Sequence, residues 1–186
     1  MNKNKQIKFL KTKLDEALSF DDISKAMNGK VKVITYPELE DYETIDELLE
    51  PYDKVVVLYM VGPNFGHYVS LFRRPNGNIE VHDPYGKYDV DMELKFCSNK
   101  FNKGKYPYLS KLIYESPYKY EYNDKQLQAD GSETATCGKH AINRLLNTDL
   151  SINQYCKIMK SYNKYGYNPD LLVCLLYEDL KNNNRY

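Results

Sequence analysis

The fold is decided by one stretch, residues 55–83, which reads VVVLYMVGPNFGHYVSLFRRPNGNIEVHD. Its parts are an apolar run, a turn, a strand, an Asn-Gly hairpin signal and a final strand, at residues 55–61, 62–66, 67–72, 76–77 and 79–83. The continuous apolar run is typical of a strand that is buried on both faces. The Asn-Gly pair favours a tight connection between antiparallel strands. The stretch therefore predicts an antiparallel meander.

Helices are predicted before and after this meander in the sequence. Apolar residues recur at helical spacing in the first twenty residues, and Asn168-Pro169-Asp170 has the composition of a helix N-terminus. The further elements expected are helices at 5–18, 21–28, 107–114, 138–147 and 169–181, a short helix from a capping box at 44–47, and strands at 31–36 and 118–122. Strands in the middle with helices at both ends indicate the α+β class, as one domain spanning residues 1–186.

The bulk composition argues against several classes of protein. Lys+Arg and Asp+Glu are equal at 26 each, so net charge gives no argument for nucleic acid as the main partner. Lysines within residues 3–13 leave an accessory nucleic-acid contact open. The N-terminus lacks the apolar core of a secretory signal, and no apolar run is long enough for a membrane span, so we expect no membrane partner.

The four cysteines form no C-x-x-C pair. This argues against a zinc ribbon or a redox motif. Because the chain also lacks a secretory signal and a membrane span, we expect free thiols in a reducing cytosol. Two of them, Cys156 and Cys174, are expected in helices as core residues. In such a setting, a single cysteine in a special local context is a candidate nucleophile.

Cys137 has that context, because it stands where a polar loop meets an amphipathic helix. A helix N-terminus offers unpaired N–H groups and a partial positive charge, which favour a thiolate and can stabilise an oxyanion. Gly138 would let a substrate backbone approach closely. The alternative is a buried, inert cysteine, which is the usual state of a free thiol.

A nucleophilic thiol needs a base, and two histidines are suited to that role. His67 begins a strand after a glycine-containing turn, and His140 lies three residues after Cys137 on the expected helix. Position alone does not choose between them. His82 precedes Asp83 in a strand, so these two side chains should point to opposite faces.

Asp83 could orient His67, because the hairpin brings both to the same end of the sheet. With a strict two-residue turn at 76–77, residue 86 would face His67, and Asp83 would be offset by three residues, or roughly 10 Å. The alternative is a residue that starts the turn at 84–86. Gln128 precedes Cys137 by nine residues and could supply a second oxyanion donor if the loop folds back. Its alternative is an ordinary surface glutamine.

Four segments occur in one order along the chain: Gly66-His67-Tyr68, Val81-His82-Asp83-Pro84-Tyr85-Gly86, Leu127-Gln128 and Thr136-Cys137-Gly138-Lys139-His140. This order resembles that of the adenain-like and ubiquitin-like-protein-specific cysteine proteases. The similarity is greatest to the branch encoded by virophages and large DNA viruses. It implies an adenain-like α+β fold with a central mixed or antiparallel sheet flanked by helices.

The resemblance also assigns roles to residues. It implies that Cys137 is the nucleophile, His67 the base, Asp83 the third member and Gln128 the oxyanion side chain. It implies that Gly66, Tyr68 and Gly138 bind substrate, and it requires no metal or cofactor. Tyr68 stands where tryptophan is usual, and Pro84 where serine is common.

The implied function is a cysteine endopeptidase that cleaves viral capsid or core precursor proteins at glycine-rich sites during maturation. It would act in the virion and in the cytoplasm of the infected host cell. The alternatives are a peptidase that removes ubiquitin or SUMO-like proteins, an acetyltransferase with the same type of triad, and a catalytically silent module that binds glycine-rich tails.

Overall fold

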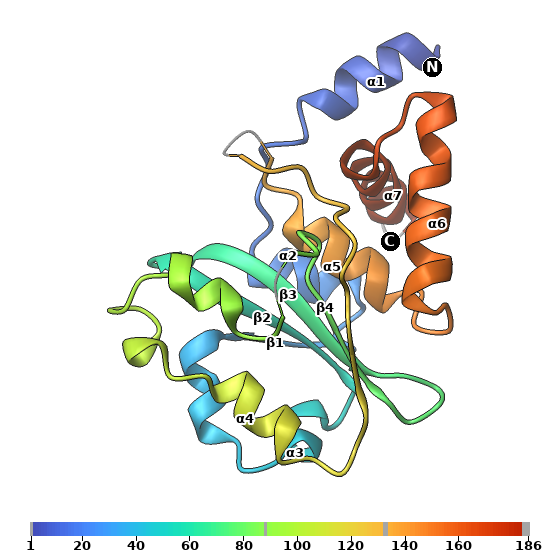
Figure 1. Cartoon of the computed structure of the whole chain (residues 1–186). Coiled ribbons are helices and arrows are strands. Elements are labelled where there is room, and N and C mark those ends of the chain that lie inside the picture. Colours follow the sequence, from blue (N-terminus) through green and yellow to red (C-terminus); the bar gives the residue numbers. More distant parts are fainter. Residues whose placement is uncertain (1, 88, 132–133, 184–186) are drawn as a thin grey trace.

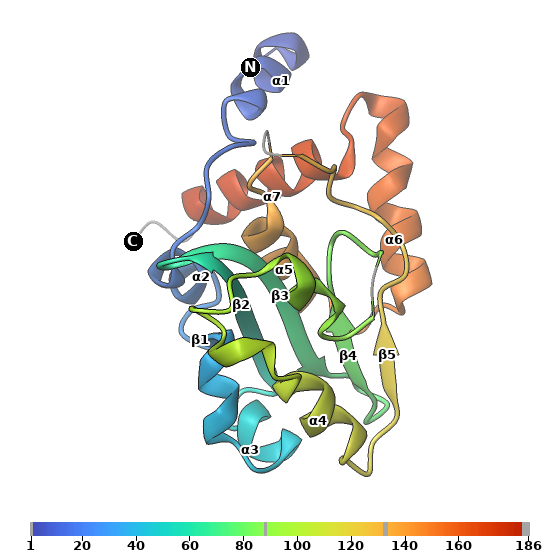
Figure 2. The ribbon, with the colours of Figure 1, turned by 60° about the vertical axis from the view of Figure 1, so that its left-hand side comes forward.

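A five-stranded sheet with the order β1-β2-β3-β4-β5 forms the centre of the computed structural model (Figure 1). The structure describes residues 2–87, 89–131 and 134–183. The strands are β1 (Lys32–Thr35), β2 (Lys54–Gly62), β3 (Phe65–Arg73), β4 (Ile79–His82) and β5 (Tyr120–Tyr122). The middle three strands pair antiparallel, which confirms the predicted meander. Both outer strands pair in parallel, β1 with β2 and β5 with β4, so the sheet is mixed (Figure 2).

Helices pack on both faces of this sheet, and the α+β class is confirmed (Figure 1). The α-helices are α1 (Lys3–Lys11), α2 (Phe20–Ala26), α3 (Ile45–Leu49), α4 (Tyr108–Tyr114), α5 (Cys137–Leu145), α6 (Ile152–Ser161) and α7 (Pro169–Asn183). Short 3₁₀ helices are η1 (Tyr36–Asp41), η2 (Met92–Phe96), η3 (Lys103–Lys105) and η4 (Tyr162–Tyr165). One face of the sheet contacts α3 and α4, and the other contacts α2, α5 and α7.

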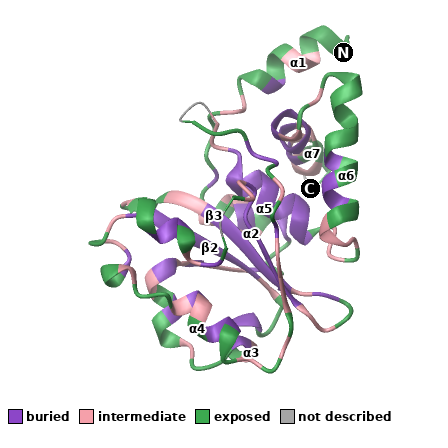
Figure 3. Ribbon diagram, in the orientation of Figure 1, coloured by how far each residue is buried: buried purple, intermediate pink, exposed green. Residues whose placement is uncertain are grey.

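Strand β2 shows why both faces are covered. Val55, Val57 and Tyr59 belong to the core beneath α3 and α4. Val56 and Leu58 alternate with them and belong to the core beneath α5. All five side chains are at most 2% exposed, as expected for a strand buried on both faces (Figure 3).

The first helix is shorter than the predicted 5–18, because the chain leaves the helix in a turn at Thr12 and Lys13. Buried Lys139 donates hydrogen bonds from Nζ to the carbonyl oxygens of Lys13 (3.0 Å) and Glu16 (2.5 Å). Those carbonyls would otherwise accept bonds within a continuing helix. A new helix, α2, then starts at a capping box formed by Ser19 and Asp22. The segment between α1 and α2 therefore runs along the N-terminal end of α5.

The hairpin between β3 and β4 corrects the strict two-residue turn expected at 76–77. Arg74 N–H donates to Asn78 O (2.8 Å) and Gly77 N–H donates to Arg74 O (2.9 Å), so the loop has three residues. Gly77 takes φ +86°, which a side chain would disfavour. The pairing places Ser70 opposite His82. Extending this register leaves Asp83 two residues, rather than three, from the position opposite His67.

Candidate active site

Cys137 is the first residue of α5, so its sulfur lies at the helix N-terminus, and it is 8% exposed. The sulfur accepts hydrogen bonds from the backbone N–H groups of Tyr68 and Gly138 and is hydrogen-bonded to the His67 side chain. Burial alone would raise the pKa of this thiol, but the hydrogen bond and charge of His67 and the two N–H groups together lower it. Cys137 is therefore disposed toward the thiolate form.

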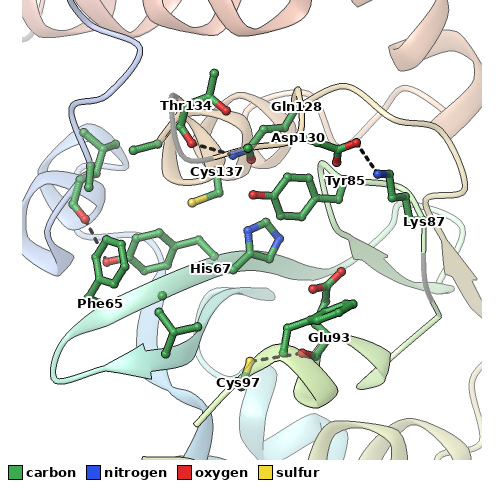
Figure 4. Close-up of a pocket in the computed structure, with 18 residues that line it drawn as sticks. Phe65, His67, Tyr85, Lys87, Glu93, Cys97, Gln128, Asp130, Thr134 and Cys137 are labelled. Carbon is green, nitrogen blue, oxygen red and sulfur yellow. Dashed lines mark hydrogen bonds and ion pairs between the residues drawn. The ribbon is translucent and has the colours of Figure 1, made fainter.

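His67 lies on β3 beside Cys137 in the groove (Figure 4). Its Nε2 is 2.8 Å from Asp83 Oδ1, and the hydrogen bond with Cys137 leaves Nδ1 as the nitrogen on the thiol side. The Tyr85 ring stacks on the imidazole with centroids 4.4 Å apart. Burial opposes a charged ring, but the charge and hydrogen bond of Asp83, with those of Cys137, raise the pKa of His67 to about 10. A thiolate–imidazolium pair is the state that this arrangement favours.

Asp83 follows β4 directly and is fully buried. Its Oδ1 accepts the Tyr85 backbone N–H (2.9 Å) as well as the His67 ring, and its Oδ2 accepts the Tyr122 hydroxyl (3.2 Å). Burial would raise the pKa of this carboxyl, but the charge and hydrogen bond of His67 and the Tyr85 N–H lower it. Asp83 therefore remains an ionised acceptor that fixes the ring of His67.

Gln128 is 1% exposed and lines the same pocket as Cys137 and His67. Its backbone N–H donates to Pro84 O (2.9 Å), which ties the loop before α5 to the turn after Asp83. The side-chain Nε2 makes only a long contact of 3.4 Å with Thr134 O, and Oε1 has no partner within the described residues. The loop thus folds back as the oxyanion hypothesis requires, and a small rotation would free the amide.

The three residues with predicted substrate contacts occupy different positions. Tyr68 and Gly66 line the pocket, and the Tyr68 hydroxyl donates to Leu18 O (3.0 Å). A Cβ atom on Gly66 would lie 1.9 Å from Tyr59 O, so the close pairing of β2 and β3 requires glycine there. The corresponding Cβ position on Gly138 faces the side chain of Leu18 at 3.2 Å rather than the pocket. For all three residues, contact with a substrate stays a prediction.

The rival base His140 is fully buried in a separate polar cluster. Its Nε2 is 3.1 Å from Asp170 Oδ1 on α7. The third histidine, His82, is also buried, and neither of its ring nitrogens has a hydrogen-bond partner within the described residues, although Nδ1 is 3.8 Å from Glu80 Oε1. Burial and the charge of Arg144 lower the pKa of His82 well below its ordinary value. Of the three histidines, His67 is the one paired with Cys137.

Comparison with known proteins links the chain to a viral relative. No family model matches the chain. It is 37% identical over 166 residues to "Uncharacterized protein V9" of Sputnik virophage, covering 86% of this chain and 93% of that protein.

This chain belongs to the family of the V9 protein.

The family places the chain among viral proteins, in agreement with the predicted virophage origin. No described helix is long and apolar enough to cross a membrane. The described residues also contain no cluster of His, Cys, Asp or Glu side chains that could hold a metal ion. The reactive groups at this site of the V9-family chain are the thiol of Cys137, the imidazole of His67 and the carboxylate of Asp83.

The pocket of this V9-family member is an open groove of about 540 Å³ above the Cys137–His67 pair. Its lining comes from β2, β3, the segment before α2, η2 and the two loops around residues 85 and 130. Exposed apolar side chains stand at its edge, namely Val61, Phe65 and Phe96. Lys87 and Asp130 form an ion pair that joins the two loops at the groove (Figure 4). An extended peptide could lie in such a groove with its backbone beside the sulfur.

Two buried acids at the site were not singled out as functional by the sequence. Asp170 accepts hydrogen bonds from the Thr136 hydroxyl (2.5 Å), the Ala129 N–H (2.9 Å) and His140. It thereby ties the residue before the nucleophile to the residue after Gln128. The only sequence signal was its place as an early acid in the last helix. The second acid is Glu93, in a region where no element was predicted.

Proposed function

We propose that the chain is a cysteine peptidase. The observation that carries the proposal is the linear array of Cys137, His67 and Asp83, in which a thiol at a helix N-terminus shares one groove with an imidazole bound to a buried carboxylate. This arrangement supplies an activated nucleophile and a general acid–base group in one place.

In this proposal the Cys137 thiolate attacks the carbonyl carbon of a peptide bond, and a C–S bond forms as the carbonyl oxygen gains negative charge. The backbone N–H of Cys137 and the Gln128 amide, once turned away from Thr134, hold this oxygen. The C–N bond then breaks, and the leaving nitrogen takes the proton of the His67 imidazolium. A thioester remains on the enzyme.

Water completes the cycle. His67, now neutral, accepts a proton from the attacking water, and the thioester C–S bond breaks to release a carboxylic acid product. The proton on His67 restores the thiolate–imidazolium pair. Asp83 holds the ring in place through both steps, because its bond to Nε2 leaves Nδ1 directed toward the sulfur and substrate.

The substrate class that we propose is a viral capsid or core precursor, cleaved at glycine-rich sites in the virion or in the cytoplasm of the infected cell. Two observations support it. The chain belongs to a virophage protein family. Cys137 lines the floor of the groove and the residue is only 8% exposed, so substrate residues with small side chains would reach its sulfur most easily.

The test is co-expression of the chain with the major capsid precursor from the same viral genome, followed by N-terminal sequencing of the capsid product. We expect a new N-terminus that disappears with Cys137→Ala. Cys156→Ala is the matched control, because Cys156 is a buried cysteine in the core beside α6 and α7, and it should leave cleavage intact. An unprocessed capsid protein with the native chain would contradict the proposed substrate.

Two reagents test the wider chemistry. Electrophilic probes built on ubiquitin or SUMO would label Cys137 if the chain acts on ubiquitin-like proteins. Acetyl transfer from acetyl-CoA without peptide cleavage would indicate the acetyltransferase. If no thiol reagent modifies Cys137 faster than Cys156, the peptidase proposal is wrong and a silent binding module remains.

A further inference from the structure

Glu93 is a buried acid that the mechanism above does not use. It lies on η2, is 8% exposed, and lines the same groove as His67 and Cys137. Figure 4 shows its side chain reaching toward His67 from the side of the groove opposite Cys137. The Oε1 atom has no hydrogen-bond partner among the described residues. A carboxylate in this position needs either a proton or a donor.

The Glu93 side chain is hydrogen-bonded to the Asp83 side chain. Two carboxyl groups can form this bond only when one of them carries a proton. Asp83 already accepts from His67, Tyr85 and Tyr122, all of which favour its ionised form. The shared proton therefore belongs to Glu93, whose hydroxyl donates to Asp83.

The groups around Glu93 bring its pKa close to neutral pH. Burial, the charge of Asp83 and the hydrogen bond to it raise the pKa of Glu93 to about 7, while the charges of His67 and Lys95 act in the opposite direction. Several titratable groups interact electrostatically with Glu93, so that each alters the pKa of the other. They are Asp83, His67, Tyr85, Tyr122, Lys95 and Cys97. These groups come from β3, β5, η2 and its C-terminal cap, and the turn after β4.

We propose that Glu93 is a positioning residue: its protonated carboxyl group holds Asp83 in line with His67, and release of that proton lowers the reactivity of Cys137. This inference rests on the proposed function. When Glu93 ionises, Asp83 loses a hydrogen-bond donor and is repelled by a second negative charge. Asp83 then holds the imidazole of His67 less firmly. The added negative charge does not increase the protonated fraction of His67, because its pKa of about 10 already keeps the ring protonated at neutral pH.

The test is the rate of alkylation of Cys137 by iodoacetamide, followed by mass spectrometry of the Cys137 peptide from pH 5.5 to pH 8.5. The reagent is neutral and needs no substrate. In Glu93→Gln the amide donates to Asp83 at every pH. We expect similar rates for the native chain and this variant below pH 6. Between pH 6 and pH 8 the native rate should fall by roughly two- to tenfold relative to the variant, the range that one hydrogen bond gives.

Two further variants make the result specific. Glu93→Leu has no donor, so it should react slowly across the range and show no inflection near pH 7. Asp130→Asn removes a negative charge from the same groove without touching Asp83, so it should keep the native inflection. Identical pH profiles for the native chain and Glu93→Gln would overturn the inference while leaving the peptidase proposal intact. A native Cys137 that reacts no faster than Cys156 would overturn both.

Discussion

Replacement of Asp170 by Asn should destabilise the fold and disturb the thiol together. Asp170 is 2% exposed and accepts three hydrogen bonds, from Thr136, His140 and Ala129. An Asn oxygen can still accept the two bonds that share Oδ1, but its NH₂ group would then face the Ala129 N–H, donor against donor. The variant therefore loses about one hydrogen bond to a charged acceptor, which contributes roughly 1.5–3 kcal/mol. For a chain of 186 residues this lowers Tm by about 3–12 °C.

Thermal unfolding at pH 7, followed by circular dichroism, measures this loss. Asp179→Asn is the matched control, because Asp179 lies exposed on the same helix, α7, and should change stability by less than about 0.5 kcal/mol. Alkylation of Cys137 in Asp170→Asn should also slow, because Ala129 adjoins Gln128 and Thr136 adjoins Cys137. A Tm that differs from the native value by less than about 1 °C would refute the reasoning, because it is smaller than the predicted loss.

The difference in Tm between the native chain and Asp170→Asn should also depend on pH. Burial would raise the pKa of Asp170, but its bonds to His140 and Thr136 lower it below its ordinary value. A carboxyl with a lowered folded-state pKa stabilises the fold above its unfolded pKa, and this stabilisation is lost as the pH falls through the folded one. The Tm difference between the native chain and Asp170→Asn should therefore be full at pH 7 and shrink below about pH 4.

Three more outcomes are expected. His67→Ala should slow alkylation of Cys137 at pH 6.5 by roughly 10²-fold or more, whereas His140→Gln should lower Tm and slow alkylation far less; the reverse result would make His140 the base. At pH 6 Cys137 should already be alkylated faster than Cys156, because its pKa is lowered; alkylation that becomes fast only above about pH 8, where a free thiol ionises, would contradict this. Glu80→Ala leaves Arg144 buried without the partner that it binds through two 2.7 Å contacts, and should cost about 3–5 kcal/mol in urea unfolding; a loss below 1 kcal/mol would contradict the pairing.

Local sequence pattern predicted the parts of the fold that depend on nearby residues. The apolar run of β2 and the Asn-Gly signal were sufficient for the meander, and the loop-to-helix change was sufficient to place Cys137 at a helix N-terminus. The parallel pairings of β1 and β5 were not predicted, because each joins short segments that are far apart in sequence. The end of α1 was also missed, because it depends on Lys139, more than a hundred residues away.

The candidate site shows the same division. Residue position could not choose between His67 and His140; the contact of His140 with Asp170 on the last helix separates them. The predicted gap between His67 and Asp83 was too large, because one extra loop residue shifts the register. Glu93 had no local signal at all, since its burial beside Asp83 follows from the path of an irregular segment.

The three hydrogen bonds of Asp170 also determine when the candidate site becomes aligned during synthesis of the chain. The thiol and the imidazole leave the ribosome well before the carboxylate that fastens the start of α5 to its neighbouring loop. A nascent chain therefore contains the reacting groups while the support that holds them in line is still missing. Their alignment is completed only when α7 has formed and docked, so a fragment that stops before α7 should be far less reactive than the chain that includes it.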